Sequence, residues 1–235
     1  NAAPTSHTAL RALRRDLPYD PMADLTPVTL LVIAPMMLVV NPSKVPARTV
    51  QELIAYLKQN PGKVTYASTG IGSVAHLSVE LFKLLTGTDM VHVPYRGNAP
   101  ALNDLLAGNV DLTIDVSSSV ASHLKSGALR SLGVTTAKRT SFDPDMPTVA
   151  ETVPGFQAFS WNGLVVRTGT PSAIVEKVGR EFASAVQQPQ AKEALARILM
   201  EPVGSTPAEF ASLIREDAAR WERVVKAINL NPEQK

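Results

Sequence analysis

The sequence contains no cysteine, and aromatic side chains make up only 5% of its 235 residues. The absence of cysteine excludes a disulfide framework, thiolate metal sites and a thiol nucleophile. The charge is also not concentrated: 23 Lys and Arg residues are spread along the chain with 21 Asp and Glu residues. Nucleic-acid binding usually requires a clustered basic surface, so no nucleic-acid partner is expected.

Long hydrophobic runs are missing as well. The longest apolar run, residues 30–40, is interrupted by Pro35 and followed by Asn41 and Pro42. It is about half as long as a membrane-spanning helix. The remaining composition, 45% hydrophobic and 19% charged, is typical of one large folded domain or two small ones. The chain begins at Asn1 without a signal-peptide pattern, so we expect it to start inside a precursor or a processed product.

Between Thr49 and Thr135, short β-rich segments alternate with amphipathic helical segments. Strands are expected at residues 63–67, 90–93, 110–114 and 129–135. This alternation is typical of βα units around a mainly parallel sheet. Thr49 and Glu52 are expected to form a capping box, and Asn98 is expected to cap the helix over residues 99–107. A further helical face is expected to contain Leu77, Leu81, Leu84 and Leu85.

After Thr136 the alternation weakens, and only one short helix, capped by Thr148 and Glu151, is expected before residue 159. A strand is then expected at 159–166, followed by helices at 172–187, 190–199 and 207–228. Thr170 is expected to cap the first of these helices, with Pro171 at its first position. These helices lack nearby strands of their own, and the apolar residues 28–40 are the only large segment able to supply one.

The sequence therefore predicts a discontinuous α/β architecture. Residues 1–41 and 159–235 are expected to form the first lobe, and residues 42–158 are expected to form an inserted second lobe. Hinge strands near Val40 and near Phe159–Trp161 would join the two lobes, with a ligand cleft between them.

Catalytic signatures are largely absent. The sequence has no Gly-x-Ser-x-Gly elbow, no His-Glu-x-x-His motif and no phosphate-binding Gly-x-x-x-x-Gly-Lys loop. The four histidines, His7, His76, His92 and His123, do not have the spacing of metal ligands on one helix. We therefore expect no catalytic residue, no metal and no cofactor.

The segment from Ser68 to His76 is the most informative one, because it joins an expected strand to an expected helix and contains Gly70 and Gly72. Free backbone N–H groups at a helix N-terminus suit a carboxylate or a phosphate. One alternative is an ordinary turn capped by Ser68 or Thr69. A second alternative is a nucleotide-binding enzyme, because residues 70–75 fit Gly-x-Gly-x-x-Ala, although Asp89 precedes the strand that the fingerprint's acidic residue should follow.

Two further loops, residues 95–98 and 115–119, are expected to leave the same edge of the sheet. Asp115 either caps Ser117 or Ser118 or faces a ligand. Arg96 is either a solvated surface charge or an anion partner. Trp161 either packs in a core or lines a cleft.

Motifs in a fixed order along nearly the whole chain resemble a known family. They are Pro18 to Pro21, Asp24 to Pro27, Leu38 to Pro42, Tyr66 to Gly70, His92 to Gly97, Asp104 to Gly108, Val110 to Leu112, Pro147 to Glu151 and Gly169 to Pro171. Together they resemble the Bug-type extracytoplasmic solute-binding receptors of tripartite tricarboxylate transporters.

The resemblance implies a type II periplasmic-binding-protein fold of two lobes. It further implies a small carboxylate ligand (a di- or tricarboxylate, an acidic amino acid or an aromatic carboxylate), membrane permease subunits as partners and a periplasmic location. Family members hold the ligand mainly with backbone amides of one loop in each lobe. The residues expected to bind ligand here are Ala67, Ser68, Thr69, Gly70, Gly72, Ser73, His76, Asp115 and Trp161.

The sequence departs from the family at its beginning. Family members start with a β-α-β-α-β segment whose Gly-rich loop supplies the first lobe's half of the site, and this sequence has no such segment. We therefore expect the first lobe to be incomplete, either through truncation or because another chain completes it. A truncated remnant that does not bind ligand remains an alternative.

Overall fold

A computed structural model describes residues 2–13 and 17–230 of the chain. The chain forms two compact units: unit 1 comprises Asn1–Ala34 and Ser160–Lys235, and unit 2 comprises Pro35–Phe159. The first crossing therefore falls at residues 34 and 35, inside strand β1 (Leu25–Val40), and not at 41 and 42. The reason is that the two halves of this 16-residue strand pair with different partners.

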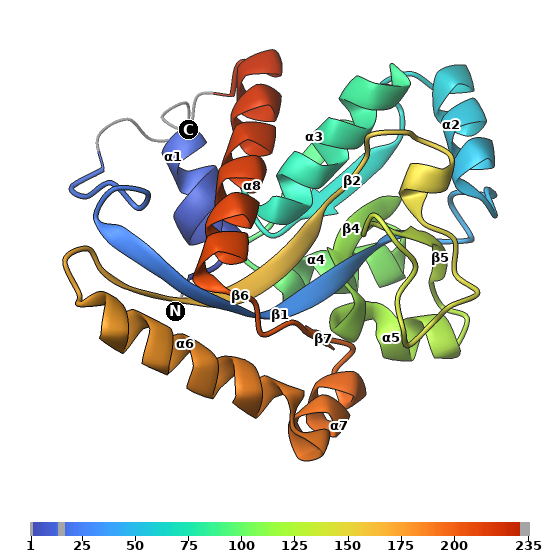
Figure 1. The fold of residues 1–235 in the computed structure, drawn as a ribbon. Helices are drawn as coiled ribbons and strands as arrows, with labels where there is room; N and C mark the ends of the chain where they lie inside the picture. Colours follow the sequence, from blue (N-terminus) through green and yellow to red (C-terminus); the bar gives the residue numbers. More distant parts are fainter. Residues whose placement is uncertain (1, 14–16, 231–235) are drawn as a thin grey trace. The chain divides into compact units, whose positions relative to one another are not determined.

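Unit 2 contains a five-stranded arrangement in the order β3-β2-β4-β1-β5 (Figure 1). Its strands besides β1 are β2 (Thr65–Ser68), β3 (Val91–Pro94), β4 (Leu112–Val116) and β5 (Arg130–Val134). Strand β2 runs parallel to β3 and β4, whereas β1 runs antiparallel to β4 and β5. The four strands of the βα region thus share one direction, and the expected parallel sheet is interrupted only by β1.

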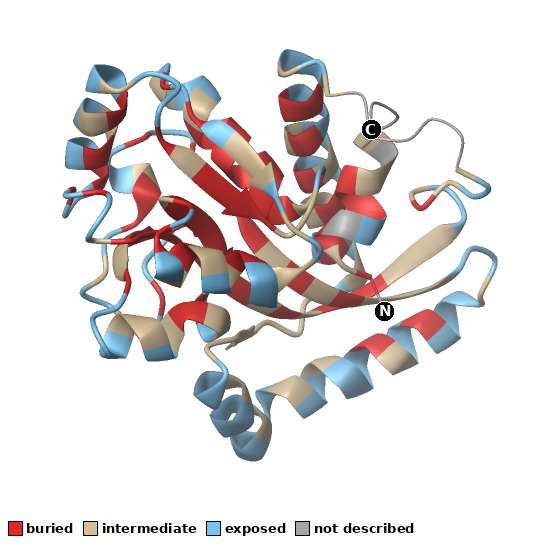
Figure 2. Cartoon of the chain, turned by 180° about the vertical axis from the view of Figure 1, so that it is seen from behind, coloured by how far each residue is buried: buried red, intermediate tan, exposed pale blue. Residues whose placement is uncertain are grey.

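The helices of unit 2 follow the expected order. They are α2 (Val50–Gln59), α3 (Val74–Thr86), α4 (Asn98–Ala107), α5 (Ser117–Lys125) and the 3₁₀ turn η2 (Val149–Glu151). Strands β2 and β4 are largely buried, whereas β3 has no buried residue (Figure 2). In α3, Leu77 and Leu81 are buried as expected, but Leu84 and Leu85 are 45% and 44% exposed. The expectation for these two residues was wrong because the buried part of α3 ends at Phe82.

Two helix caps of unit 2 illustrate how far local sequence determines structure. Thr49 caps α2 by accepting the N–H of Glu52 at 3.1 Å, as expected. The Glu52 carboxylate, however, accepts the N–H of Arg48 rather than that of Thr49, so the reciprocal bond of the capping box is shifted by one residue. The box of Thr148 and Glu151 at η2 is complete.

Unit 1 contains the first half of β1 together with β6 (Phe159–Arg167) and β7 (Glu201–Pro202), both of which pair with β1. Its helices are η1 (Thr5–Ala9), α1 (Leu10–Leu13), α6 (Ser172–Gln187), α7 (Pro189–Arg197) and α8 (Pro207–Ala227). Helices α6 and α8 lie on opposite sides of the paired strands β1 and β6, and α8 packs against η1 and α1 (Figure 1).

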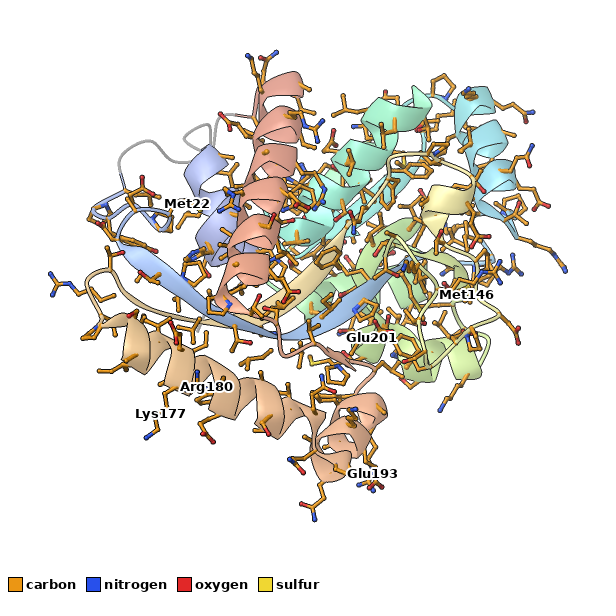
Figure 3. All side chains as sticks on the ribbon, in the orientation of Figure 1. Met22, Met146, Lys177, Arg180, Glu193 and Glu201 are labelled. Carbon is orange, nitrogen blue, oxygen red and sulfur yellow. The ribbon has the colours of Figure 1, made fainter. Side chains whose placement is uncertain are left out.

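Helix α6 spans the expected residues, but its cap differs from the expectation. Pro171 occupies the N-cap position, with Ser172 as the first helical residue. Thr170 donates its hydroxyl to the carbonyl of Arg167 and does not cap the helix. Lys177 and Arg180 are exposed on α6 (Figure 3).

Helix α8 buries most of its expected apolar stripe, including Phe210, Ile214 and Trp221. The same face also buries Asp217, which the hydrophobic pattern does not reveal. In the described part of the chain, no helix combines the length and the apolar character that crossing a membrane requires.

Candidate functional site

The candidate site is built around the loop between β2 and α3 in unit 2. Strand β2 ends at Ser68, and α3 begins at Val74 after the N-cap residue Ser73, whose hydroxyl accepts the N–H of His76 at 3.2 Å. Gly70 has a φ of 133° and Gly72 a φ of 75°, values that side-chain-bearing residues rarely adopt. The two glycines therefore let the backbone turn tightly enough to present its amides at the start of α3.

Several amides of this segment have no hydrogen-bond partner within the described residues. Among residues 17–230, no hydrogen-bond partner is recorded for the N–H groups of Thr69, Ile71, Val74 and Ala75. The last two belong to the first turn of α3, where the N–H groups lack intrahelical acceptors and the helix dipole is positive. The segment thus offers backbone donors and a favourable potential to an anion without a basic side chain.

Strand register brings the loops of unit 2 together at one edge. Ser68 pairs with Pro94 of β3, and Ala67 pairs with Thr113 of β4, in parallel ladders. The loops that follow these strands therefore leave the same edge of the sheet, as expected. A direct bond supports this, because the N–H of Tyr95 donates to the carbonyl of Ser68 at 3.0 Å.

Asp115 lies at this edge and makes a contact that corrects two expectations. Its Oδ2 accepts a hydrogen bond from the side-chain amide of Asn98, and its Oδ1 accepts the N–H of Val116 at 2.7 Å. Asp115 therefore caps neither Ser117 nor Ser118, because Val116 occupies the N-cap position of α5 and no side chain of the described residues caps the first turn. Nor does Asn98 cap α4, because Gly97 occupies the cap position without a side-chain bond.

Burial affects the pKa of Asp115. The residue is only 7% exposed, and this desolvation raises the pKa of its carboxyl group, while the bonds from Val116 and Asn98 lower it.

A stack of three rings lies behind the loop. The imidazoles of His76 and His92 are nearly parallel, with centroids 4.0 Å apart, and the ring of Tyr66 is 4.8 Å from that of His92. Each histidine bonds to the loop: Gly72 donates its N–H to Nδ1 of His76 at 3.0 Å, and Ser68 Oγ lies 2.6 Å from Nε2 of His92.

Sequence reasoning did not find this stack, since it treated each histidine alone. The missing signal was strand register: Tyr66 and His92 are directly paired in the ladder between β2 and β3. Desolvation lowers the pKa of both histidines to about 4, with the positive charge of Lys83 as a second cause at His76 and the neighbouring His76 ring at His92. Both rings are therefore neutral at pH 7.

Ser68 and His92 are close enough to suggest an activated nucleophile, but the surroundings favour a structural role. Ser68 is 1% exposed, and its hydroxyl also contacts the N–H and the carbonyl of Gly70. In the part of the chain that the structure describes, no group of three or more His, Cys, Asp or Glu side chains is arranged to hold a metal ion.

The structure places the other candidate residues outside this constellation. Trp161 has no exposed surface and packs edge-on against Phe210 in the core of unit 1, so core packing, rather than the lining of a cleft, accounts for it. Arg96 is exposed. Asp89 is exposed before β3, with a carboxylate oxygen 3.7 Å from Nζ of Lys83, and Tyr95 stands where a dinucleotide fingerprint needs an acid.

Comparison with known proteins extends this local picture. The family model described as tripartite tricarboxylate transporter family receptor matches residues 3–230. Protein BugT of Bordetella pertussis is 36% identical over 216 residues, covering 92% of this chain and 66% of BugT. The chain spans about two thirds of the length of the curated relatives it matches.

Solved structures give the same result. An R. palustris protein solved with adipate is 38% identical, with a TM-score of 0.83 over 96% of this chain and 75% of that one. MatC from Rhodopseudomonas palustris with bound malate is 32% identical, with a TM-score of 0.78 over 95% of this chain and 77% of that one. These likenesses confirm the expected α/β, two-lobed fold of a solute-binding protein. The chain therefore belongs to the family of tripartite tricarboxylate transporter receptors.

Proposed function

We propose that this chain is a solute-binding receptor that captures a small carboxylate on the loop of residues 69–73. The observation that carries the proposal is the set of free N–H groups of Thr69, Ile71, Val74 and Ala75 at the positive end of α3. Two relatives of similar fold were solved with dicarboxylates, adipate and malate. A receptor binds and releases its ligand unchanged, so no catalytic group is required.

The residues proposed to contact the ligand all belong to unit 2. Thr69, Ile71 and the first turn of α3 provide the amides, and Ala67 and Ser68 end the strand that positions them. Gly70 and Gly72 let the backbone turn, and Ser73 and His76 fix the loop. Asp115 sits at the same edge, where its carboxylate can accept a hydrogen bond from a hydroxyl or an amine of the ligand.

The partners and location follow from the family as further parts of the proposal. Units 1 and 2 are taken as the two lobes of the receptor, the location as the periplasm and the partner as the membrane permease subunits of the transporter. A receptor must also release its cargo, so a micromolar dissociation constant, about −8 kcal/mol, is sufficient.

Isothermal titration calorimetry with malate, adipate, acidic amino acids and aromatic carboxylates tests the proposal. Ser73→Ala removes the cap of α3 and is expected to weaken binding about fivefold, since a cap contributes about 1 kcal/mol. Thr49→Ala is the matched control, because it removes the cap of α2 in the same unit without touching the loop.

Two outcomes favour the alternatives. Heat on titration with NAD or NADP, lost in Gly70→Ala, would support a nucleotide-binding enzyme. A folded chain that binds neither a carboxylate nor a nucleotide would support the non-binding remnant.

A further inference from the structure

The loop of residues 69–73 is fixed by a hydrogen-bond acceptor, Nδ1 of His76, which could no longer accept once it was protonated. The Gly72 N–H donates to Nδ1 of His76 at 3.0 Å. The position of His76 is fixed in turn, because its backbone N–H donates to Ser73 Oγ. A ring nitrogen that accepts a hydrogen bond carries no hydrogen. The His76 ring must therefore be neutral, with its hydrogen on Nε2.

The contacts of Ser68 show that Nε2 of the second imidazole, His92, carries a hydrogen. Its hydroxyl lies 3.2 Å from the N–H of Gly70, 3.1 Å from the carbonyl of Gly70 and 2.6 Å from Nε2 of His92. A hydroxyl donates one hydrogen bond and accepts two. All three contacts form together when Ser68 donates to the carbonyl and accepts from the amide and from a hydrogen on Nε2 of His92. Protonation of His92 would leave this bond in place, so His76 alone is sensitive to a proton on the side that faces the loop.

The groups packed around the stack do not compensate for an added proton. From α3, Glu80 is already bonded to Lys83 at 2.9 Å and accepts the hydroxyl of Tyr66 from β2. From β3, the His92 ring faces His76 at 4.0 Å. The remaining charge nearby is Asp89, which is exposed and lies 3.7 Å from Lys83. Glu80 and Lys83 balance each other, so a second cation in this cluster has no partner of its own.

We propose that His76 is a positioning residue whose neutral ring fastens Gly72, and that a proton on Nδ1 releases the loop and weakens carboxylate binding. Two N–H donors would then face each other across 3.0 Å, and the Gly72 amide would have to turn away. Burial keeps the pKa of His76 near 4, so the loop is fastened at neutral pH and released only in acid. The part that concerns ligand rests on the proposed function, whereas the fastening of Gly72 does not.

The fastening is tested without ligand by NMR on the full chain labelled with nitrogen-15. At pH 7.5 we expect His76 to show an unprotonated Nδ1 and a protonated Nε2. Towards pH 4 we expect the Gly72 amide resonance to shift with the same midpoint as the His76 ring. A protonated Nδ1 at pH 7.5, or a Gly72 amide that does not respond when the ring titrates, would overturn the proposal.

The effect on binding is tested with adipate as the probe. His76→Asn places an amide oxygen where Nδ1 stands and does not titrate, so it keeps an acceptor for Gly72 at every pH. Wild type is expected to lose affinity more steeply than His76→Asn between pH 7.5 and 4.0, by about twofold, because half of the His76 rings are protonated when the pH equals their pKa. Protonation of adipate itself affects both proteins equally and cancels in this comparison. His123→Asn, on α5, is the matched control and is expected to follow wild type.

A second variant and the pattern of outcomes separate the two proposals. His76→Leu removes the acceptor and is expected to bind weakly at both pH values; if it does not fold, wild type and His76→Asn decide. Equal pH profiles for wild type and His76→Asn, or tighter binding to wild type in acid, would overturn the role of His76 while the receptor function stands. Absence of adipate binding at pH 7.5 would count against the proposed function, and the NMR titration would still decide the fastening of Gly72.

Discussion

Trp161 and Asp217 are joined in the core of unit 1, where the indole N–H donates to Oδ2 of the carboxylate at 3.2 Å. The same oxygen accepts the hydroxyl of Thr8 at 2.7 Å, and Oδ1 accepts from Arg220 at 2.8 Å. One buried carboxylate thus connects η1, β6 and α8, three elements that are distant in the sequence. A buried acid with this many donors is a point at which unit 1 is sensitive to a single change.

Asp217→Ala should destabilise unit 1 by about 3 to 5 kcal/mol, because it removes the buried carboxylate that accepts hydrogen bonds from Arg220, Thr8 and Trp161. Urea unfolding followed by tryptophan fluorescence measures this directly, since both tryptophans of the chain belong to unit 1. Glu222→Ala, at an exposed position of α8, should change the unfolding free energy by no more than about 0.5 kcal/mol. Equal effects of the two substitutions would contradict the role given to Asp217.

Gly163→Ala should also destabilise unit 1, because a Cβ at Gly163 would overlap the ring of Phe210. Overpacking of this kind costs about 1 to 3 kcal/mol. The double variant Gly163→Ala with Phe210→Leu should recover part of that loss, and a double-mutant cycle from urea unfolding measures the coupling. Additive effects would show that the two positions do not share this space.

The stability of unit 2 should fall as the pH drops from 6.5 to about 4. Burial lowers the pKa of His76 and of His92 to about 4, so the unfolded chain binds more protons than the folded chain within this window and stability decreases with acid. The lowering of the His76 pKa from 6.5 to about 4 corresponds to about 3 kcal/mol in the free energy of unfolding. Above pH 6.5 the titration of these two rings should not change the stability of unit 2.

Amide hydrogen exchange of β2 and β4 at pH 7, 5.5 and 4.5 measures this dependence within unit 2. Asp115 acts in the opposite sense, because its raised pKa favours the folded state in acid. The difference between wild type and His76→Asn removes that contribution. A difference that does not grow towards pH 4.5 would contradict the prediction.

Much of the fold was accessible from the sequence, because its signals are local. Helix α6 has the expected bounds, Gly87 and Gly108 end their helices in the left-handed conformation, and the loop at residues 69–73 lies between a strand and a helix as expected. In each case the responsible residues are neighbours in the chain. Local patterns also led to the prediction that this loop binds an anion.

What the sequence did not reveal depends on register and on tertiary contacts. The sequence predicts Asn98 to be a helix cap, but its side-chain amide donates a hydrogen bond to Asp115, which lies beside it on β4. His76 and His92 show no pattern in the sequence. They meet because α3 packs on β2, whose neighbour in the sheet is β3. From the sequence, Trp161 could either pack in a core or line a cleft. Its packing against Phe210 decides between these two positions.

Gly72→Ala should weaken adipate binding, whereas Gly87→Ala should not, although both lie in the left-handed region with φ values of 75° and 62°. A side chain at such a position costs about 1 to 2 kcal/mol, so both variants should lose similar stability. Gly87 closes the far end of α3, with no atom within 4 Å of an added Cβ, while Gly72 bonds to His76 within the loop. Calorimetry with adipate, alongside thermal unfolding, separates strain from loss of the site. Equal affinities of the two variants would mean that the geometry at Gly72 does not support the ligand.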